Sequence, residues 1–444
     1  MTILQMYATD MRASFQGDRA DIAVWTCVIV ALATMMFSIA IAQAAVLLSI
    51  LMLLGSVIHR HFSGASPDKR TGSPDASGSQ AQTTPSETTG PVVSTQPARS
   101  LLPWVFAAFI IARVIAIPFS IHPALSMSAF RTEIPFYFFF YILLFILDGS
   151  GEARLRVIIH LLLLAAVLAT IVGFTRYAMG MDARLTSTTA GYYTLGMFLA
   201  SVFALAFALG RRHDIFPNRI IWMLVCVFLL LGLLFTFNRL HWVSAGVMAL
   251  LIGVARERRI LLVLISAAVL AMLTVAPLQE RFMQLIEAGS HMSGRDVLWR
   301  GAWMLIPEHP ITGFGLHTFR EIFPLFDVIE DKGVGSWHND YLQVYMDSGL
   351  LALLPFLGVL VTVFVYAFRN HRRWERGSLQ HDLNFAFAVM LVGFALAGGM
   401  LDSLLSILFR TGLAVIAVLY YARPPARGGG RDAVTAQKGD VYVR

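Results

Sequence analysis

The sequence predicts an all-α polytopic membrane protein with about twelve transmembrane helices and a helical cap on its outer face. Of its 444 residues, 57% are apolar and only 14% are charged. Uninterrupted apolar runs of about twenty residues recur along the chain, which is the length that a helix needs to cross a bilayer. Because lipid cannot hydrogen-bond an open backbone, such runs must form helices or a closed barrel, and the alternating pattern of barrel strands is absent.

Twelve apolar runs are candidates for these spans. The first two are the least sharply divided, because only Gln43 interrupts them. In chain order the runs cover Ile22 to Phe37, Ile41 to Ile58, Leu101 to Phe119, Ala129 to Leu147, Val157 to Phe174, Tyr192 to Leu209, Ile220 to Phe237, Trp242 to Val254, Ile260 to Ala276, Leu350 to Phe368, Phe385 to Leu401 and Leu404 to Tyr421.

The positions of the basic residues predict how the chain is oriented. The net charge of +7 comes from Lys and Arg in short connections between apolar runs, so it indicates membrane topology and no nucleic-acid partner. If the N-terminus is cytoplasmic, these basic connections lie inside, and the C-terminus is cytoplasmic too. The stretch from Pro277 to Gly349 then faces outward, with five basic residues against ten acidic ones.

Composition also divides the chain into segments. Residues 63–100 are rich in Ser, Thr, Pro, Gly and Gln, which predicts a disordered linker. Cys27 and Cys226 lie singly in apolar runs, so no disulfide framework or zinc site is expected, and no cleavable signal peptide is evident. The expected organisation is 1–62 (N-terminal segment and two spans), 63–100 (cytoplasmic linker), 101–276 (spans three to nine), 277–349 (outer loop domain), 350–421 (last three spans) and 422–444 (cytoplasmic tail).

The long outer loop has enough aromatic side chains to fold as an ordered cap. Ser293 to Asp296 matches a capping box, and apolar residues then recur at helical spacing until Pro310. Arg295, Trp299 and Trp303 are expected on one face of this helix, since they are four residues apart. A second short helix is expected to start near His338 and to stop around Gly349, directly before an apolar run.

Chemistry at the outer face of a cytoplasmic membrane needs a substrate that is already activated, because no nucleoside triphosphate is available there. A sugar on a lipid diphosphate meets this need. Its transfer requires a group that stabilises the departing diphosphate and a base that takes the proton of the attacking hydroxyl. No Asp-x-Asp occurs in the chain, so arginine is favoured over a metal, and no cofactor is expected.

His338 is the preferred candidate for the base. A neutral imidazole suits this role near pH 7, and a position at a helix N-terminus disfavours its protonated form. A capping or interfacial histidine is the open alternative. The neighbouring Asn339 is a candidate for binding sugar hydroxyls or for capping the helix.

Arginines on the same side are candidates for the diphosphate. Arg239 lies between two apolar runs with almost no loop, where bidentate hydrogen bonds to phosphate would suit it and snorkelling is the alternative. Arg184 lies in a short loop with Thr186, Ser187, Thr188 and Thr189, a group that either binds phosphate or sugar oxygens or forms an ordinary polar loop.

Arg295, Arg300 and Trp299 are candidates for the polar edge of a groove for the lipid carrier, with a solvated helix face as the alternative. Two further arginines, Arg113 and Arg410, fall inside apolar runs, which usually marks a paired or functional group. Asp402 is the expected ion-pair partner of Arg410, and no role is assigned to Arg113.

The stretch from Arg295 to Leu353 resembles the outer-loop signature of bacterial O-antigen ligases and O-antigen polymerases. The resemblance comprises an Arg followed by Trp299, then His309-Pro310-x-Thr312-Gly313-x-Gly315, and finally His338-Asn339-x-Tyr341-Leu342 with Gly349-Leu350. Upstream, Asn238-Arg239 stands where this superfamily commonly has Ser-Arg, and the twelve-span plan with one dominant outer loop resembles the ligase branch.

The resemblance implies a GT-C-like, inverting, metal-independent glycosyltransferase of the bacterial inner membrane, with a periplasmic active face. It would move O-antigen polysaccharide from undecaprenyl diphosphate to a sugar of lipid A-core. His338 would be the base on the acceptor hydroxyl, and Arg239 and Arg295 would bind the diphosphate. The expected partners are therefore this donor, the lipid A-core acceptor and membrane lipids.

Three other functions stay open at this stage. An O-antigen polymerase would use the same chemistry on another lipid-linked chain, and a protein O-oligosaccharyltransferase would use a Ser or Thr acceptor. A transporter predicts charged residues near the middle of several spans, in broken segments.

Overall fold

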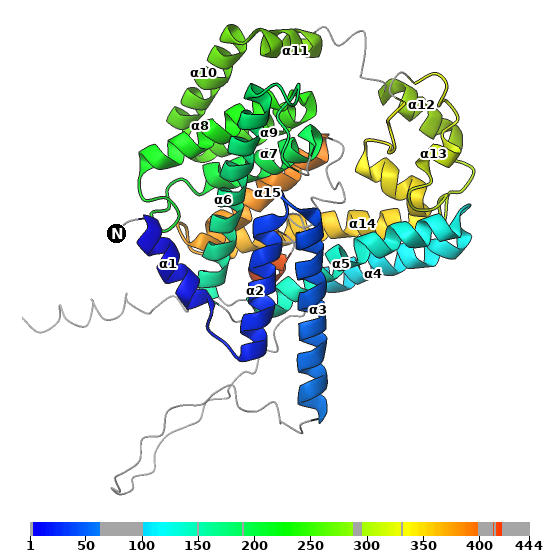
Figure 1. The fold of residues 1–444 in the computed structure, drawn as a ribbon, viewed down its shortest axis with the longest axis horizontal. Helices are drawn as coiled ribbons and strands as arrows, with labels where there is room; N and C mark the ends of the chain where they lie inside the picture. Colours follow the sequence, from blue (N-terminus) through cyan, green and yellow to red (C-terminus); the bar gives the residue numbers. More distant parts are fainter. Residues whose placement is uncertain are drawn as a thin grey trace, which may run out of the picture.

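Helices form all the regular structure of the described residues. The computed structural model describes residues 3–62, 101–148, 151–188, 191–286, 295–329, 332–397, 412 and 414–419, and no strand occurs within these ranges (Figure 1). The all-α class is therefore confirmed for this part of the chain. The helices are α1 (Ile3–Ser14), α2 (Arg19–Thr34), α3 (Ile39–Phe62), α4 (Leu102–Ala116), the 3-10 helix η1 (Ile117–Phe119), α5 (Pro123–Leu147), α6 (Gly151–Ala178), α7 (Tyr192–Ala208), α8 (Arg219–Phe235), α9 (Arg239–Arg256), α10 (Arg258–Thr274), α11 (Ala276–Ile286), α12 (Arg295–Leu305), α13 (Phe319–Ile322), α14 (Asp340–Arg373) and α15 (Leu379–Ala397).

Every expected apolar run except the last coincides with one of these helices. The last run, the linker at 63–100 and the tail at 422–444 lie wholly or mostly outside the described residues, as do Asp402 and Arg410. Helices α1 and α11 are not among the expected elements. Each has an apolar face on an otherwise polar segment, a pattern that gives a surface helix without a long apolar run.

Five helices are long and apolar enough to cross a membrane. A sixth candidate is the pair α10 and α11, which is bent by 102° at a short break. The helical fold and these spans are those of a polytopic membrane protein, and the full count of twelve stays a prediction. The five candidates are Ile39–Ser56, Leu102–Phe119, Pro123–Leu147, Glu152–Ala178 and Asp340–Arg373.

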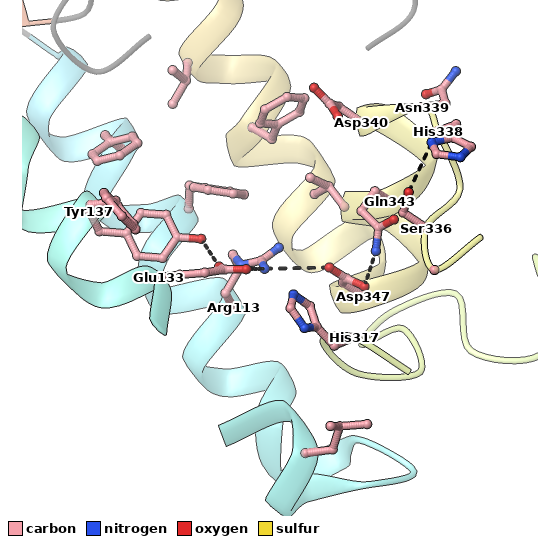
Figure 2. Close-up of a pocket in the computed structure, with 18 of the residues that line it drawn as sticks. Arg113, Glu133, Tyr137, His317, Ser336, His338, Asn339, Asp340, Gln343 and Asp347 are labelled. Carbon is pink, nitrogen blue, oxygen red and sulfur yellow. Dashed lines mark hydrogen bonds and ion pairs between the residues drawn. The ribbon is translucent and has the colours of Figure 1, made fainter. Parts of the chain in front are cut away.

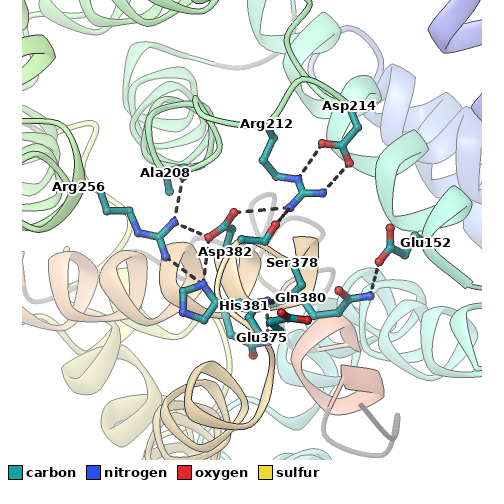
Figure 3. Close-up of polar contacts among 12 residues, drawn as sticks. Glu152, Ala208, Arg212, Asp214, Arg256, Glu375, Ser378, Gln380, His381 and Asp382 are labelled. Atoms are coloured by element: carbon teal, nitrogen blue, oxygen red, sulfur yellow. Dashed lines mark hydrogen bonds and ion pairs between the residues drawn. The ribbon is translucent and has the colours of Figure 1, made fainter. Parts of the chain in front are cut away.

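One end of the bundle is joined by ion pairs between helices that are distant in sequence (Figure 3). Asp382 of α15 accepts from Arg256 at the end of α9, 2.7 Å away, and lies 3.6 Å from Arg212. Arg212 also contacts Asp214 at 2.8 Å. Several of the basic residues that predict the inside face are therefore neutralised by acids within the protein.

A second hydrophobic cluster, called here the cap cluster, lies between α12 and the start of α14, and its place on the outer face of a membrane stays a prediction. Its buried members include Leu298, Phe319 and Trp337, and it is separate from the main core of the bundle. Figure 1 shows α12 and α13 together near the first turns of α14. Helix α12 ends at Leu305 and not at Pro310, because the residue before a proline is driven out of the helical conformation and Pro307 comes first.

Helix α14 is broken at Gly349, where the short expected helix was predicted to stop. Gly349 has φ 63° and ψ −164°, a conformation open only to glycine. The segment 310–315 crosses the break: Leu350 N–H donates to Pro310 O at 2.9 Å, and Phe314 N–H donates to Met346 O at 2.7 Å. The glycines of the signature motif thus allow two backbones to touch.

Candidate functional site

A pocket of about 640 Å³ with a mixed apolar and charged lining lies where α4, α5 and the start of α14 meet the turn at 335–339 (Figure 2). Aromatic side chains such as Phe109 and Tyr137 line part of its wall. His338 and Asn339, both predicted site residues, line it too. The pocket therefore brings the expected base next to a cavity large enough for sugar rings.

His338 is held in a strained turn just before α14. Its φ is 51°, which is uncommon for a residue with a side chain and which clusters at functional sites. The imidazole is exposed, its Nδ1 lies 3.2 Å from Ser336 Oγ, and its ring centroid is 6.3 Å from that of Tyr193. Trp337 anchors the turn, because its buried indole packs edge-on against Phe319 in the cap cluster.

Asn339 caps α14. Its side-chain oxygen accepts the N–H of Leu342 at 3.1 Å, as expected of an N-cap residue. The capping alternative from the sequence therefore describes Asn339 in this structure.

The lining of the pocket holds three charged side chains from three helices, of which two are buried and one is partly buried (Figure 2). Arg113 of α4 lies 2.9 Å from Glu133 of α5 and 3.6 Å from Asp347 of α14. Tyr137 Oη donates to Glu133 at 2.5 Å. Arg113 was singled out as a charge in an apolar run, and the same signal marks Glu133 in the run Ala129 to Leu147. Asp347 precedes the next apolar run, and the pairing of the three depends on how their helices pack.

A cluster of three arginines lies at the N-terminal end of α9. Arg281 of α11 interacts electrostatically with both Arg184 and Arg239, and its Nε donates to Phe237 O at 3.3 Å. Phe237 has a positive φ of 51° directly before the helix N-cap Asn238. The structure thus brings Arg184 and Arg239 together as predicted candidates and adds Arg281, which the sequence reasoning missed.

The loop that carries Arg184 is fixed by its own polar side chains. Thr186 and Arg176 both donate to Asp182, at 2.8 and 2.7 Å, and these bonds hold the pKa of the Asp182 carboxyl below its usual range. Ser187 Oγ donates to Met36 O at 2.9 Å. The hydroxyls offered as phosphate ligands by the sequence therefore serve to hold the loop, whereas Thr189 lies outside the described residues.

Two adjacent tyrosines connect the arginine cluster to the pocket. The Arg184 guanidinium lies over the ring of Tyr192, 4.4 Å from its centroid. Tyr193 lines the pocket and has its ring beside that of His338. The Tyr193 ring also lies 4.7 Å from that of His241 in α9, so it contacts both the pocket histidine and the residue two positions after Arg239.

The candidates on α12 are placed differently. The side chain of Arg295 lies outside the described part of the structure. Arg300 is exposed, 3.8 Å from Asp296, so it sits on a solvated helix face. Trp299 packs against the cap cluster, whereas Trp303 is 72% exposed. The two tryptophans differ because helical spacing turns Trp303 about 40° further from the buried side.

Metal ligands are not grouped in the described ranges: no three His, Cys, Asp or Glu side chains there could hold one ion. The lining of the pocket carries positive charge on Arg113 and Arg320, whereas Arg184, Arg239 and Arg281 are grouped at the N-terminal end of α9. Independence from metal stays a prediction for experiment.

The helices and this site define a polytopic membrane protein with a pocket lined by apolar and charged side chains and with a cluster of arginines at the N-terminal end of α9. A family model described as O-antigen ligase matches residues 224–357. This match covers less than half of the chain, so residues 224–357 are similar to the O-antigen ligase family. The matched stretch includes Arg239, Arg281, His338 and Asp347. No curated protein matches the chain.

Proposed function

We propose that this protein is an O-antigen ligase, which transfers polysaccharide from undecaprenyl diphosphate to a sugar of lipid A-core. The observation that carries the proposal is that the Tyr193 ring lies beside both His338 in the pocket and His241 of α9, two residues after Arg239 in the arginine cluster. A diphosphate needs concentrated positive charge, and an acceptor hydroxyl needs a base within reach. This region supplies both.

In the proposed reaction, His338 takes the proton of the acceptor hydroxyl as its oxygen attacks the anomeric carbon. The bond from that carbon to the diphosphate oxygen breaks, and the lipid diphosphate leaves with the electron pair. Arg184, Arg239 and Arg281 stabilise the negative charge that develops on it. A single displacement from the opposite face inverts the anomeric configuration.

A transporter is the second candidate, because one observation favours it. Arg113, Glu133 and Asp347 lie within candidate spans, and α14 is broken two residues after Asp347. These charges also line the pocket that contains His338, where they would serve transfer equally well. Loss of function on His338→Ala separates the two functions, since transport needs no base.

The test is complementation of a bacterial strain that lacks its own ligase, with lipopolysaccharide ladders read on a gel. We expect wild type to restore the ladder, and His338→Ala, Arg239→Ala and Arg281→Ala to fail at normal protein levels. Arg300→Ala is the control, because Arg300 is an exposed arginine on a solvated face. A ladder restored by His338→Ala would show that the base assignment is wrong.

The acceptor is tested in the same strain. A polymerase would lengthen lipid-linked chains without joining them to lipid A-core, and a protein O-oligosaccharyltransferase would modify a pilin-like protein without producing a ladder. Transfer in vitro should persist in excess chelator. If a divalent cation is needed to restore it, the arginine mechanism is wrong.

A further inference from the structure

The turn that carries His338 is bonded to α14 through the side chain of Gln343. Its Oε1 accepts the backbone N–H of Trp337 at 3.1 Å, and its Nε2 donates to Asp347 Oδ1 at 2.8 Å. The amide is thus bonded at both ends, which fixes the way it faces. Trp337 directly precedes His338, so this bond constrains the position of the imidazole.

Asp347 is itself held from two other helices. Its Oδ2 lies 3.6 Å from Arg113 Nη2, and the same nitrogen lies 2.9 Å from Glu133. The side chains of Arg113 and Asp347 are each only 5% exposed, where a charge requires a fixed partner. A continuous set of contacts therefore runs from α5 through α4 and α14 to the turn at His338 (Figure 2).

We propose that Gln343 and Asp347 are positioning residues, which hold the Trp337–His338 turn so that the imidazole faces the pocket. The proposal rests on the proposed function for its catalytic readout. Neither residue needs to touch substrate. The turn has to be held, because the backbone of His338 is in a sparsely populated conformation that the surroundings must impose.

The direction of the bonds offers a sharp test. Gln343→Glu keeps an acceptor for Trp337 but sets one carboxylate against that of Asp347. Asp347→Asn removes the charge that pairs with Arg113. The double variant restores all three contacts with the donor and acceptor between positions 343 and 347 exchanged. The amide introduced at position 347 donates to the carboxylate introduced at position 343, and the oxygen of that amide accepts from Arg113. We therefore expect each single variant to be impaired and the double variant to recover.

Two measurements compare the wild type with these variants in detergent. The first is transfer kinetics: kcat should fall about ten- to a hundredfold in Gln343→Glu, with KM for the lipid-linked donor unchanged, because a small displacement of a reacting group costs that much. The second is hydrogen exchange at the Trp337 amide, which should speed up in Gln343→Met. That variant keeps the volume and removes both bonds without adding charge.

Asp382→Asn is the matched control. Asp382 is a similarly buried carboxylate paired with arginines, at the other end of α9 from the arginine cluster (Figure 3). It should lower thermal stability and leave kcat per folded molecule unchanged. If Asp382→Asn lowers kcat as much as Gln343→Glu, the effect is general loss of structure and the proposal is wrong.

Two further results would overturn the positioning role. The first is a hydrogen-exchange rate of the Trp337 amide in Gln343→Met that equals the wild-type rate. The second is a double variant whose kcat is no higher than expected if the effects of the two single substitutions simply add. If the wild type transfers no sugar at all, the proposed function fails, while exchange at Trp337 still decides whether Gln343 holds the turn.

Discussion

Gly349→Ala should be one of the most damaging small substitutions in this chain. An added Cβ would lie 2.1 Å from Ile311 O and 2.6 Å from Thr312 N, both backbone atoms that cannot rotate away. The backbone at Gly349, with φ 63° and ψ −164°, adds strain of about 1–3 kcal/mol for any residue with a side chain. Displacing segment 310–315 also breaks the bonds from Leu350 and Leu351, at about 1 kcal/mol each.

The sum is about 3–5 kcal/mol of unfolding free energy. Substitutions at two other glycines distinguish the contribution of backbone strain from that of the clash with segment 310–315. Gly180 has φ +69° and open space around it, so Gly180→Ala should cost only the strain, about 1–2 kcal/mol. Gly55 is helical with open space, so Gly55→Ala should stabilise by about 0.5–1 kcal/mol.

The assay is denaturant or thermal unfolding of the three variants in one detergent, followed by tryptophan fluorescence. The expected order of stability is Gly55→Ala, wild type, Gly180→Ala and then Gly349→Ala. If Gly349→Ala unfolds together with Gly180→Ala, the close approach of segment 310–315 to the break is refuted.

Three further predictions concern charges. Arg113→Leu should cost about 3–5 kcal/mol, measured by unfolding, because it leaves the buried carboxylate of Asp347 and the partly buried one of Glu133 without their cation; wild-type stability would contradict the ion pairs. Arg281→Ala should raise KM for the lipid-linked donor more than KM for the acceptor, which steady-state kinetics with each substrate varied in turn would measure. A rise in KM for the acceptor alone would count against the diphosphate site. The pKa of Asp182 is depressed below its ordinary 3.8, so its stabilising effect is present above that ordinary value and is lost as the pH falls through the lower folded value. Asp182→Asn should therefore differ from wild type in unfolding temperature at neutral pH and converge with it on acidification, whereas a constant difference at all pH values would refute the linkage.

The helices could be predicted because they depend on neighbouring residues. Runs such as Tyr192 to Leu209 are continuous apolar segments, and their helices coincide with them closely. The start of α14 after Asn339 and its break at Gly349 also follow from local signals, a side-chain cap and a glycine. Pro307 was an equally local signal for the end of α12 and was overlooked.

The candidate site was predictable only in its most local parts. His338, Arg239 and Arg184 drew attention as polar groups beside apolar runs; the structure places His338 on the pocket and groups the two arginines with Arg281. Glu133, Gln343 and Arg281 were missed, because their significance comes from partners on other helices. The hydroxyls after Arg184 could not be interpreted from sequence either, since Met36, which accepts from Ser187, is 151 positions away.

The sequence alone determined an all-helical chain of membrane-spanning composition and the few residues suited to acid–base and phosphate chemistry, because helix formation and side-chain chemistry are local properties. Its orientation in the membrane stays a prediction. Tertiary structure decided which charges meet. Arg113, Glu133 and Asp347 can be buried only together, because an isolated charge in the interior is too costly, and the packing of α4, α5 and α14 is what brings them within contact.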